Sequence, residues 1–161
     1  MRPRSWQPPV ALNPAEAMIV RRVRRAKLFV FLREQRHALF DTAYQEELAS
    51  MYADALRGQP PVPSALLALA TVLQAYMGVS DDEAVEACVM DRRWQLVLDC
   101  LDCADAPFSK GTLVAFRERL ITADLDRRLV ERTVAVAAKT KRFGHQQLRL
   151  ARDRSKTRSI S

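Results

Sequence analysis

The chain has 161 residues, of which 48% are apolar and only four are Gly, a composition that suits one packed domain with tails. An apolar run of about 18 residues, the minimum for a membrane span, is missing, and no apolar segment follows the basic N-terminus. The sequence therefore predicts no membrane association and no signal peptide. Three cysteines without a secretion signal favour the reducing cytoplasm over a disulfide framework.

The net charge of +7 conceals three blocks. Residues 1–36 carry nine Arg or Lys and two Glu, residues 37–138 carry nine basic and sixteen acidic residues, and residues 139–161 carry eight basic residues and one Asp. Basic ends around an acidic body are typical of proteins that bind a polyanion such as nucleic acid. Solvated, disordered termini have the same composition, so the charge alone leaves both interpretations open.

An all-α fold is predicted, because Ala, Leu, Arg and Glu dominate and alternating β-branched runs are missing. We expect a small multi-helix domain over residues 14–139, with a core like a helix-turn-helix. Residues 1–13 are expected to form an extended arm, and residues 140–161 a basic, weakly ordered tail. Both termini are predicted to be disordered.

The hydrophobic period and the capping residues place the individual helices. Asn13, Ser80 and Ser109 are predicted N-caps, and Gly78 is a predicted helix stop. In chain order, the predicted helices cover residues 14–35, 41–56, 64–77, 81–90, 94–100, 109–121 and 124–139. The helix 64–77 is apolar on nearly all sides and is therefore expected to lie at the centre of the core.

Residues 66–90 have the layout of a helix-turn-helix, with an apolar helix, a short Gly turn and a capped helix. The second helix of a DNA reader should present basic or amide groups to the major groove. Here it begins with Asp81, Asp82 and Glu83, which would repel phosphates. We therefore expect this unit to have an architectural role.

The helix that begins at Ser109 is a better candidate for groove contact, because small hydroxyl and basic groups suit phosphates and base edges. Its candidate DNA-binding residues are Ser109, Lys110, Thr112, Arg117 and Arg119. The alternative interpretation is an ordinary amphipathic helix, and both can hold because opposite faces are involved.

A second group of candidate DNA-binding residues forms a basic run in the first helix, where a phosphate-binding face and a solvated helix face are the two alternatives. This group comprises Arg21, Arg22, Arg24 and Arg25.

Cys100 and Cys103 have C-x-x-C spacing, but only Cys88 remains as a further thiol for a zinc site, which needs four ligands. The two histidines show no ligand spacing. Buried or incidental thiols are therefore favoured over a metal or redox site. No phosphate-binding Gly loop, nucleophile motif or paired general acid and base is found, so neither a cofactor nor a metal nor a catalytic residue is expected.

Three blocks together resemble the N-terminal domain of bacterial insertion-sequence transposases of the DDE type. They are residues 66–85, residues 91–95 and residues 107–120, in which Ser109, Thr112 and Leu113 fit the family's pattern. The resemblance covers roughly residues 28–138. It implies a helical domain that binds the terminal DNA of the insertion element, ahead of a ribonuclease-H-like catalytic domain with three metal-binding acidic residues.

The sequence departs from the family where that catalytic domain should begin. Asp153 stands where the first metal-binding Asp is expected, but its neighbours are basic rather than an apolar strand. The chain is therefore interpreted as a truncated or frameshifted transposase without catalytic activity of its own. The partners expected from the resemblance are insertion-element DNA and, less directly, a second copy or full-length transposase.

Two rival hypotheses remain. The chain could act as a dimerisation or docking module on full-length transposase, through the acidic capped helix and the apolar stripe of Tyr44, Met51 and Tyr52. It could alternatively be a non-functional pseudogene product. An enzyme is the weakest interpretation, since it predicts metal-dependent nicking that depends on Asp153.

Overall fold

A computed structural model describes residues 2–53 and 61–140. These residues form helices and loops and contain no strand, which confirms the predicted all-α class. The helices are α1 (Pro14–Arg22), α2 (Leu28–Leu39), α3 (Thr42–Ala49), α4 (Ser64–Met77), α5 (Asp81–Met90), α6 (Arg92–Leu98), α7 (Lys110–Thr122) and α8 (Asp126–Thr140). The predicted tail falls almost entirely in residues 141–161, outside the described residues.

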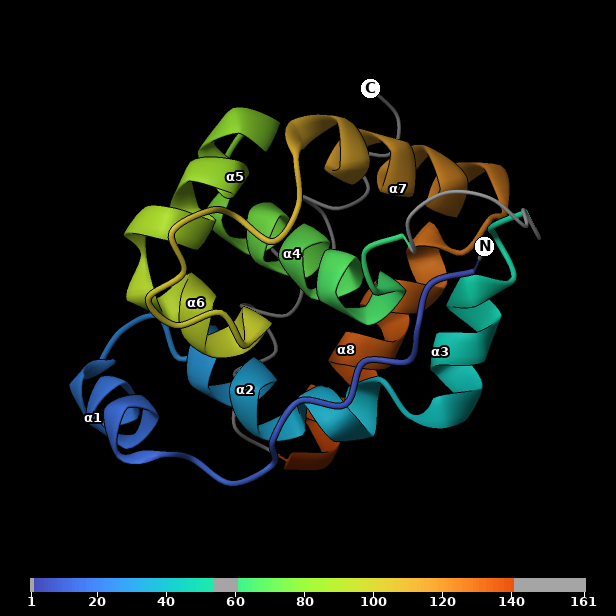
Figure 1. The fold of residues 1–161 in the computed structure, drawn as a ribbon. Coiled ribbons are helices and arrows are strands. Elements are labelled where there is room, and N and C mark those ends of the chain that lie inside the picture. Colours follow the sequence, from blue (N-terminus) through green and yellow to red (C-terminus); the bar gives the residue numbers. More distant parts are fainter. Residues whose placement is uncertain (1, 54–60, 141–161) are drawn as a thin grey trace.

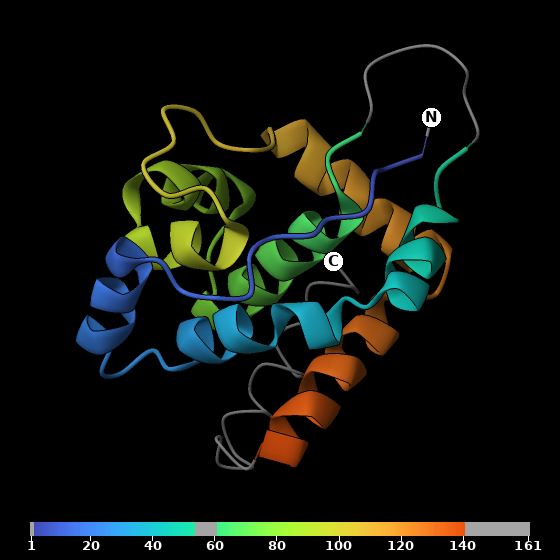
Figure 2. The same cartoon turned by 60° about the horizontal axis from the view of Figure 1, so that its bottom comes forward.

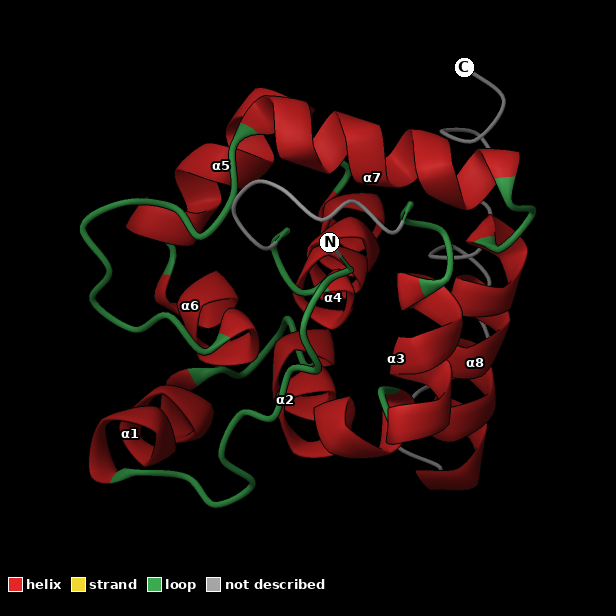
Figure 3. Ribbon diagram, turned by 45° about the vertical axis from the view of Figure 1, so that its right-hand side comes forward, coloured by secondary structure: helices red, strands yellow, loops and turns green. Residues whose placement is uncertain are grey.

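Helix α4 is the centre of the core, as its composition predicts. Its apolar side chains are buried on nearly every side, and α3, α5, α6 and α7 all pack against it. Figure 3 shows α4 nearly end-on, with the other helices arranged around it. Gly78 has a φ of 67° and ends the helix in the left-handed conformation, which costs Gly little because it has no Cβ.

Local capping signals set several boundaries where the sequence predicts them. Ser80 and Asn13 both form capping boxes, with Glu83 and Glu16 respectively, and Ser109 accepts a hydrogen bond from the Thr112 amide. Helices α4 and α5 meet at 106° across the turn at Gly78, an angle typical of helix-turn-helix units. The geometry is compatible with that motif, which remains a prediction.

The first predicted helix is wrong in its extent, because residues 14–35 are divided between α1 and α2 by residues 23–27. In a continuous helix Glu16 and Arg33 would lie about 25 Å apart along the axis. In the structure Arg33 Nε donates to Glu16 Oε2 at 2.9 Å, so α1 must fold back beside α2. Repulsion between neighbouring arginines in residues 21–25 adds a local reason for the break.

Other predicted helices also differ at their ends. The helix predicted over residues 94–100 spans Arg92–Leu98, because Asp91 caps its start and Asp99 ends it with a φ of 55°. The helix predicted over residues 41–56 ends at Ala49, and residues 54–56 lie outside the described residues. The last helix begins at Asp126 rather than Asp124, because Asp124 adopts a φ of 57° and belongs to the preceding turn. Helix boundaries set by turn conformation and packing are not encoded in the hydrophobic period.

The N-terminal arm contains no helix or strand in residues 2–13, but it is not disordered. Trp6 exchanges two backbone hydrogen bonds with the buried Gln45 side chain, at 2.6 and 2.9 Å. Arg33 donates to the carbonyls of Val10 and Ala11, and Arg36 donates to the carbonyl of Pro9. Figure 2 shows the arm running across α2 and α4. Side-chain donors far along the chain therefore satisfy its backbone and fix its position.

Arg33 and Arg36, one turn apart on α2 and each 1% exposed, form what we call the arginine clamp. Arg36 donates to the carbonyls of Leu96 and Val97 at 3.2 and 3.0 Å, near the C-terminus of α6. These carbonyls lie in the last turn of a helix, where no helical partner is available. Burial, and to a smaller extent the charge of Arg33, lowers the pKa of Arg36 to about 10. The guanidinium of Arg36 therefore remains charged near neutral pH.

Within the described residues, no single helix is long and apolar enough to cross a membrane. Only α4 and α5 taken together have the required length and composition, and they are sharply bent relative to each other.

The Glu16–Arg33 pair gives a prediction about stability and pH. Burial alone would raise the pKa of Glu16, but the Arg33 hydrogen bond, the Asn13 amide and the charges of Arg33 and Arg36 lower it below the ordinary 4.5. Because the folded-state pKa is lowered, the stabilisation should be complete above pH 4.5 and be lost as the pH falls through the folded-state pKa. Glu16→Gln should cost about 3 kcal/mol at neutral pH.

Urea unfolding of wild type and Glu16→Gln at neutral and acid pH measures this effect, and the variant should show the flatter dependence on pH. Glu86→Gln, at an exposed position of α5, is the control and should change little. Equal losses in the two variants at neutral pH would contradict a stabilising role for the buried pair.

Candidate nucleic-acid interface

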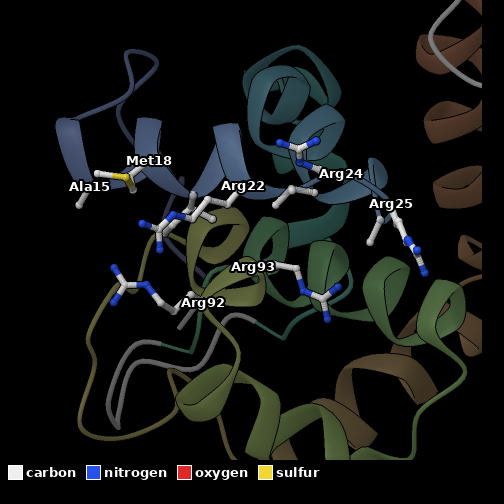
Figure 4. Close-up of a pocket in the computed structure, with 10 residues that line it drawn as sticks. Ala15, Met18, Arg22, Arg24, Arg25, Arg92 and Arg93 are labelled. Atoms are coloured by element: carbon white, nitrogen blue, oxygen red, sulfur yellow. The ribbon is translucent and has the colours of Figure 1, made fainter.

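A hollow of about 760 Å³ lies between α1, the linker of residues 23–27 and the start of α6. We call it the arginine pocket (Figure 4). Five arginines line it together with apolar side chains: Ala15, Met18, Ile19, Arg22, Val23, Arg24, Arg25, Ala26, Arg92 and Arg93.

The clamp on α2 explains why these segments meet. Glu16 fixes α1 to Arg33, and the carbonyls of Leu96 and Val97 fix α6 to Arg36. The break in the first predicted helix places Arg24 and Arg25 in the linker, where they line the same hollow as Arg92 and Arg93 of the first turn of α6. In Figure 4, Arg22 and Arg92 lie at one end of the pocket, whereas Arg93 and Arg25 lie at the other.

The two α6 arginines have acidic neighbours. Arg93 pairs with Asp91 through contacts of 2.7 and 3.1 Å and lies over the Phe29 ring at 4.7 Å. The hydrogen bonds that Arg93 donates to Asp91 raise the pKa of Arg93 and outweigh the effect of its burial. Arg92 reaches Asp102 at 3.4 Å, but both side chains are more than half exposed, so this pair contributes little stability.

The three arginines of α1 and the linker differ from the α6 pair. Arg22, Arg24 and Arg25 are exposed, and none of their side chains forms an ion pair or hydrogen bond in the described part of the chain. Positive charge therefore exceeds negative charge around the pocket. A concave surface with one sign of charge concentrates the electric field and attracts ligands of opposite charge.

The structure brings together only part of the predicted basic run. Arg22, Arg24 and Arg25 line the pocket, whereas Arg21 is exposed but lies outside it. Arg92 and Arg93 were not predicted as binding residues. Their adjacency in the sequence was visible, but their meeting with the first group depends on tertiary contacts that the sequence does not reveal.

The candidates on α7 lie elsewhere and are engaged in contacts within the protein. Ser109 caps the helix and its hydroxyl lies 3.0 Å from that of Thr112, while the exposed Lys110 reaches Asp82 at 3.0 Å. Arg119 lies over the Tyr52 ring at 4.3 Å. Groove contact by this helix stays a prediction, and the structure adds a role in packing for each of these side chains.

Arg117 makes the strongest of the α7 contacts. Its two terminal nitrogens each bind one Asp81 oxygen at 2.8 Å, and Nη1 also donates to Gln74 at 3.0 Å. Both ion-pair partners are about one fifth exposed. This bidentate pair joins α7 to the first turn of α5, so the acidic start of α5 is neutralised within the domain.

The apolar stripe expected to serve docking lies largely inside the core. Tyr44 is 2% exposed and Tyr52 is 8% exposed, while Met51 is partly buried against them. Arg132 of α8 lies over the Tyr44 ring at 4.2 Å. These side chains hold the domain together instead of offering a free face.

The cysteines gather near the end of α5 and the loop after α6. Cys103 donates to the Cys88 carbonyl at 3.3 Å, and burial raises the pKa of both Cys88 and Cys100 to about 12. Such thiols remain protonated near neutral pH and are poor nucleophiles. No group of three or more His, Cys, Asp or Glu suited to a metal ion occurs in residues 2–53 and 61–140.

Residues 21–119 match the family described as Transposase domain (DUF772), and the match spans more than half of the chain. The chain belongs to this transposase domain family. Membership supports a role related to transposition, and the matched range includes all five arginines of the pocket. No curated protein and no solved structure matches the chain.

The contact between Arg117 and Asp81 predicts that Arg117 stabilises this transposase domain. Arg117→Ala should lower the free energy of unfolding by about 1–3 kcal/mol, because the substitution removes both charged hydrogen bonds from Arg117 to the Asp81 carboxylate. A double-mutant cycle with Asp81→Ala, measured by urea unfolding, isolates the pair. Additive losses in the double variant would show that the two residues do not act together.

Proposed function

We propose that this transposase domain binds DNA and that the arginine pocket makes its principal phosphate contacts. The observation that carries the proposal is the meeting of arginines from α1, the linker and α6 around one hollow. Arg22, Arg24 and Arg25 are exposed there without an acidic partner among the described residues. Guanidinium groups bind phosphate oxygens through paired hydrogen bonds, and this electrostatic contribution dominates non-specific affinity for DNA.

The proposal assigns the domain a binding role in transposition and no catalytic step of its own. Its DNA is expected to be the ends of an insertion element, as the resemblance to DDE transposases implies. The helix that begins after Ser109 provides a second contact with DNA when Lys110 leaves Asp82 and binds a phosphate instead. Lys110 and Asp82 are more than half exposed, so their ion pair opposes such an exchange only weakly.

The rival hypothesis of a docking module is less well supported by the structure. Its apolar stripe is mostly buried, and Asp81 and Asp82 already have basic partners on α7. The exposed large apolar residues include Val10, Met18, Met90 and Ile121, which belong to four different segments. Scattered single residues of this kind are ordinary on a protein surface.

Substitution of single arginines in the pocket tests the proposal. Arg22→Ala and Arg92→Ala should each weaken binding to a duplex about five- to tenfold, the loss expected for one charged hydrogen bond. Each should also lower the slope of log K against log salt concentration by about one. Fluorescence anisotropy titrations at several salt concentrations measure both quantities.

Arg127→Ala is the matched control, because Arg127 is exposed on α8 and does not line the pocket. It removes the same charge and should leave the affinity within about twofold. Thermal melts should show that all three variants remain folded. Equal effects of Arg22→Ala and Arg127→Ala would mean that net charge, not the pocket, determines binding.

A further inference from the structure

The arginine pocket is larger than a phosphate contact requires. Its volume of about 760 Å³ falls in the range of small-molecule sites. A phosphate on the outside of a duplex needs only one or two donors on an open surface. The hollow therefore has room for a whole nucleotide.

The lining of the pocket is as much apolar as basic. Half of the ten residues are apolar, with Met18 and Ile19 on α1, and Val23 and Ala26 in the linker. Met18 is 44% exposed, so its thioether side chain remains accessible to a ligand. A duplex backbone presents charged phosphates and sugars, which make no favourable apolar contact with the exposed Met18 side chain. An unpaired nucleotide, in contrast, presents a phosphate together with a flat base whose faces can stack on apolar side chains.

The arrangement of the side chains suits such a ligand. Arg22 and Arg92 lie at one end of the pocket, and Met18 is on the same helix as Arg22 (Figure 4). Guanidinium groups can bind a phosphate and can also stack on a base with their planar face. The apolar α1 side chains can cover the other face of the base.

We propose that the arginine pocket holds an unpaired nucleotide of a DNA strand, with its phosphate on the arginines and its base against Met18 and Ile19. This inference rests on the proposed function and specifies the kind of DNA that the pocket prefers. The domain would then recognise a frayed or single-stranded position in preference to a fully paired duplex.

The test compares two DNA probes with equal numbers of phosphates, a blunt duplex and a duplex with a short unpaired extension. Wild type should bind the extended probe about tenfold more tightly, the gain expected for burial of one base. Met18→Ser should reduce this preference about fivefold by removing apolar contact. Fluorescence anisotropy measures all four affinities.

Met90→Ser is the matched control, because Met90 is 74% exposed on α5 and lies outside the pocket. It should keep the full preference for the extended probe. Equal binding of both probes by wild type would overturn the inference and leave DNA binding intact. Failure to bind either probe at low salt would overturn the proposed function itself. A preference unchanged in Met18→Ser would also overturn the inference, because the base would then lie elsewhere.

Discussion

The arginine clamp determines how the rest of the domain is arranged. Arg33 and Arg36 lie in the core, where an isolated charge would be strongly destabilising. One carboxylate, that of Glu16, and carbonyls from the arm and from α6 surround the two guanidinium groups. Because each partner lies on a different segment, satisfying the buried charge requires α1, α6 and the arm to assemble around α2.

The candidate interface is a consequence of that assembly. The clamp contacts lie on α1 and α6 at Glu16, Leu96 and Val97. Arg22, Arg92 and Arg93 of the pocket lie at the other ends of these helices. The same helices therefore present polar groups to the core and positive charge to the outside. Mutual repulsion among the exposed arginines is offset by the buried contacts that hold the helices together.

Several other basic residues form ion pairs that join elements of the domain. Arg117 and Lys110 neutralise the acidic start of α5, and Arg128 and Arg132 join α8 to Glu47 and Asp41 of the α3 region. These contacts use side chains that look similar in the sequence to those of the pocket. Arg22, Arg24 and Arg25 of the pocket differ from these structural arginines, because their side chains pair with no carboxylate or carbonyl in the described part of the chain.

The sequence by itself determined the helical class and the central helix α4. It also determined the stop at Gly78 and the caps at Asn13, Ser80 and Ser109. These signals involve residues within about four positions of each other. It also marked Arg22, Arg24 and Arg25 as candidates. Only the tertiary structure decided the break between α1 and α2, the ordered arm and the joining of these arginines with Arg92 and Arg93. Those features depend on contacts between residues 17 to 61 positions apart, whose pairing no local pattern encodes.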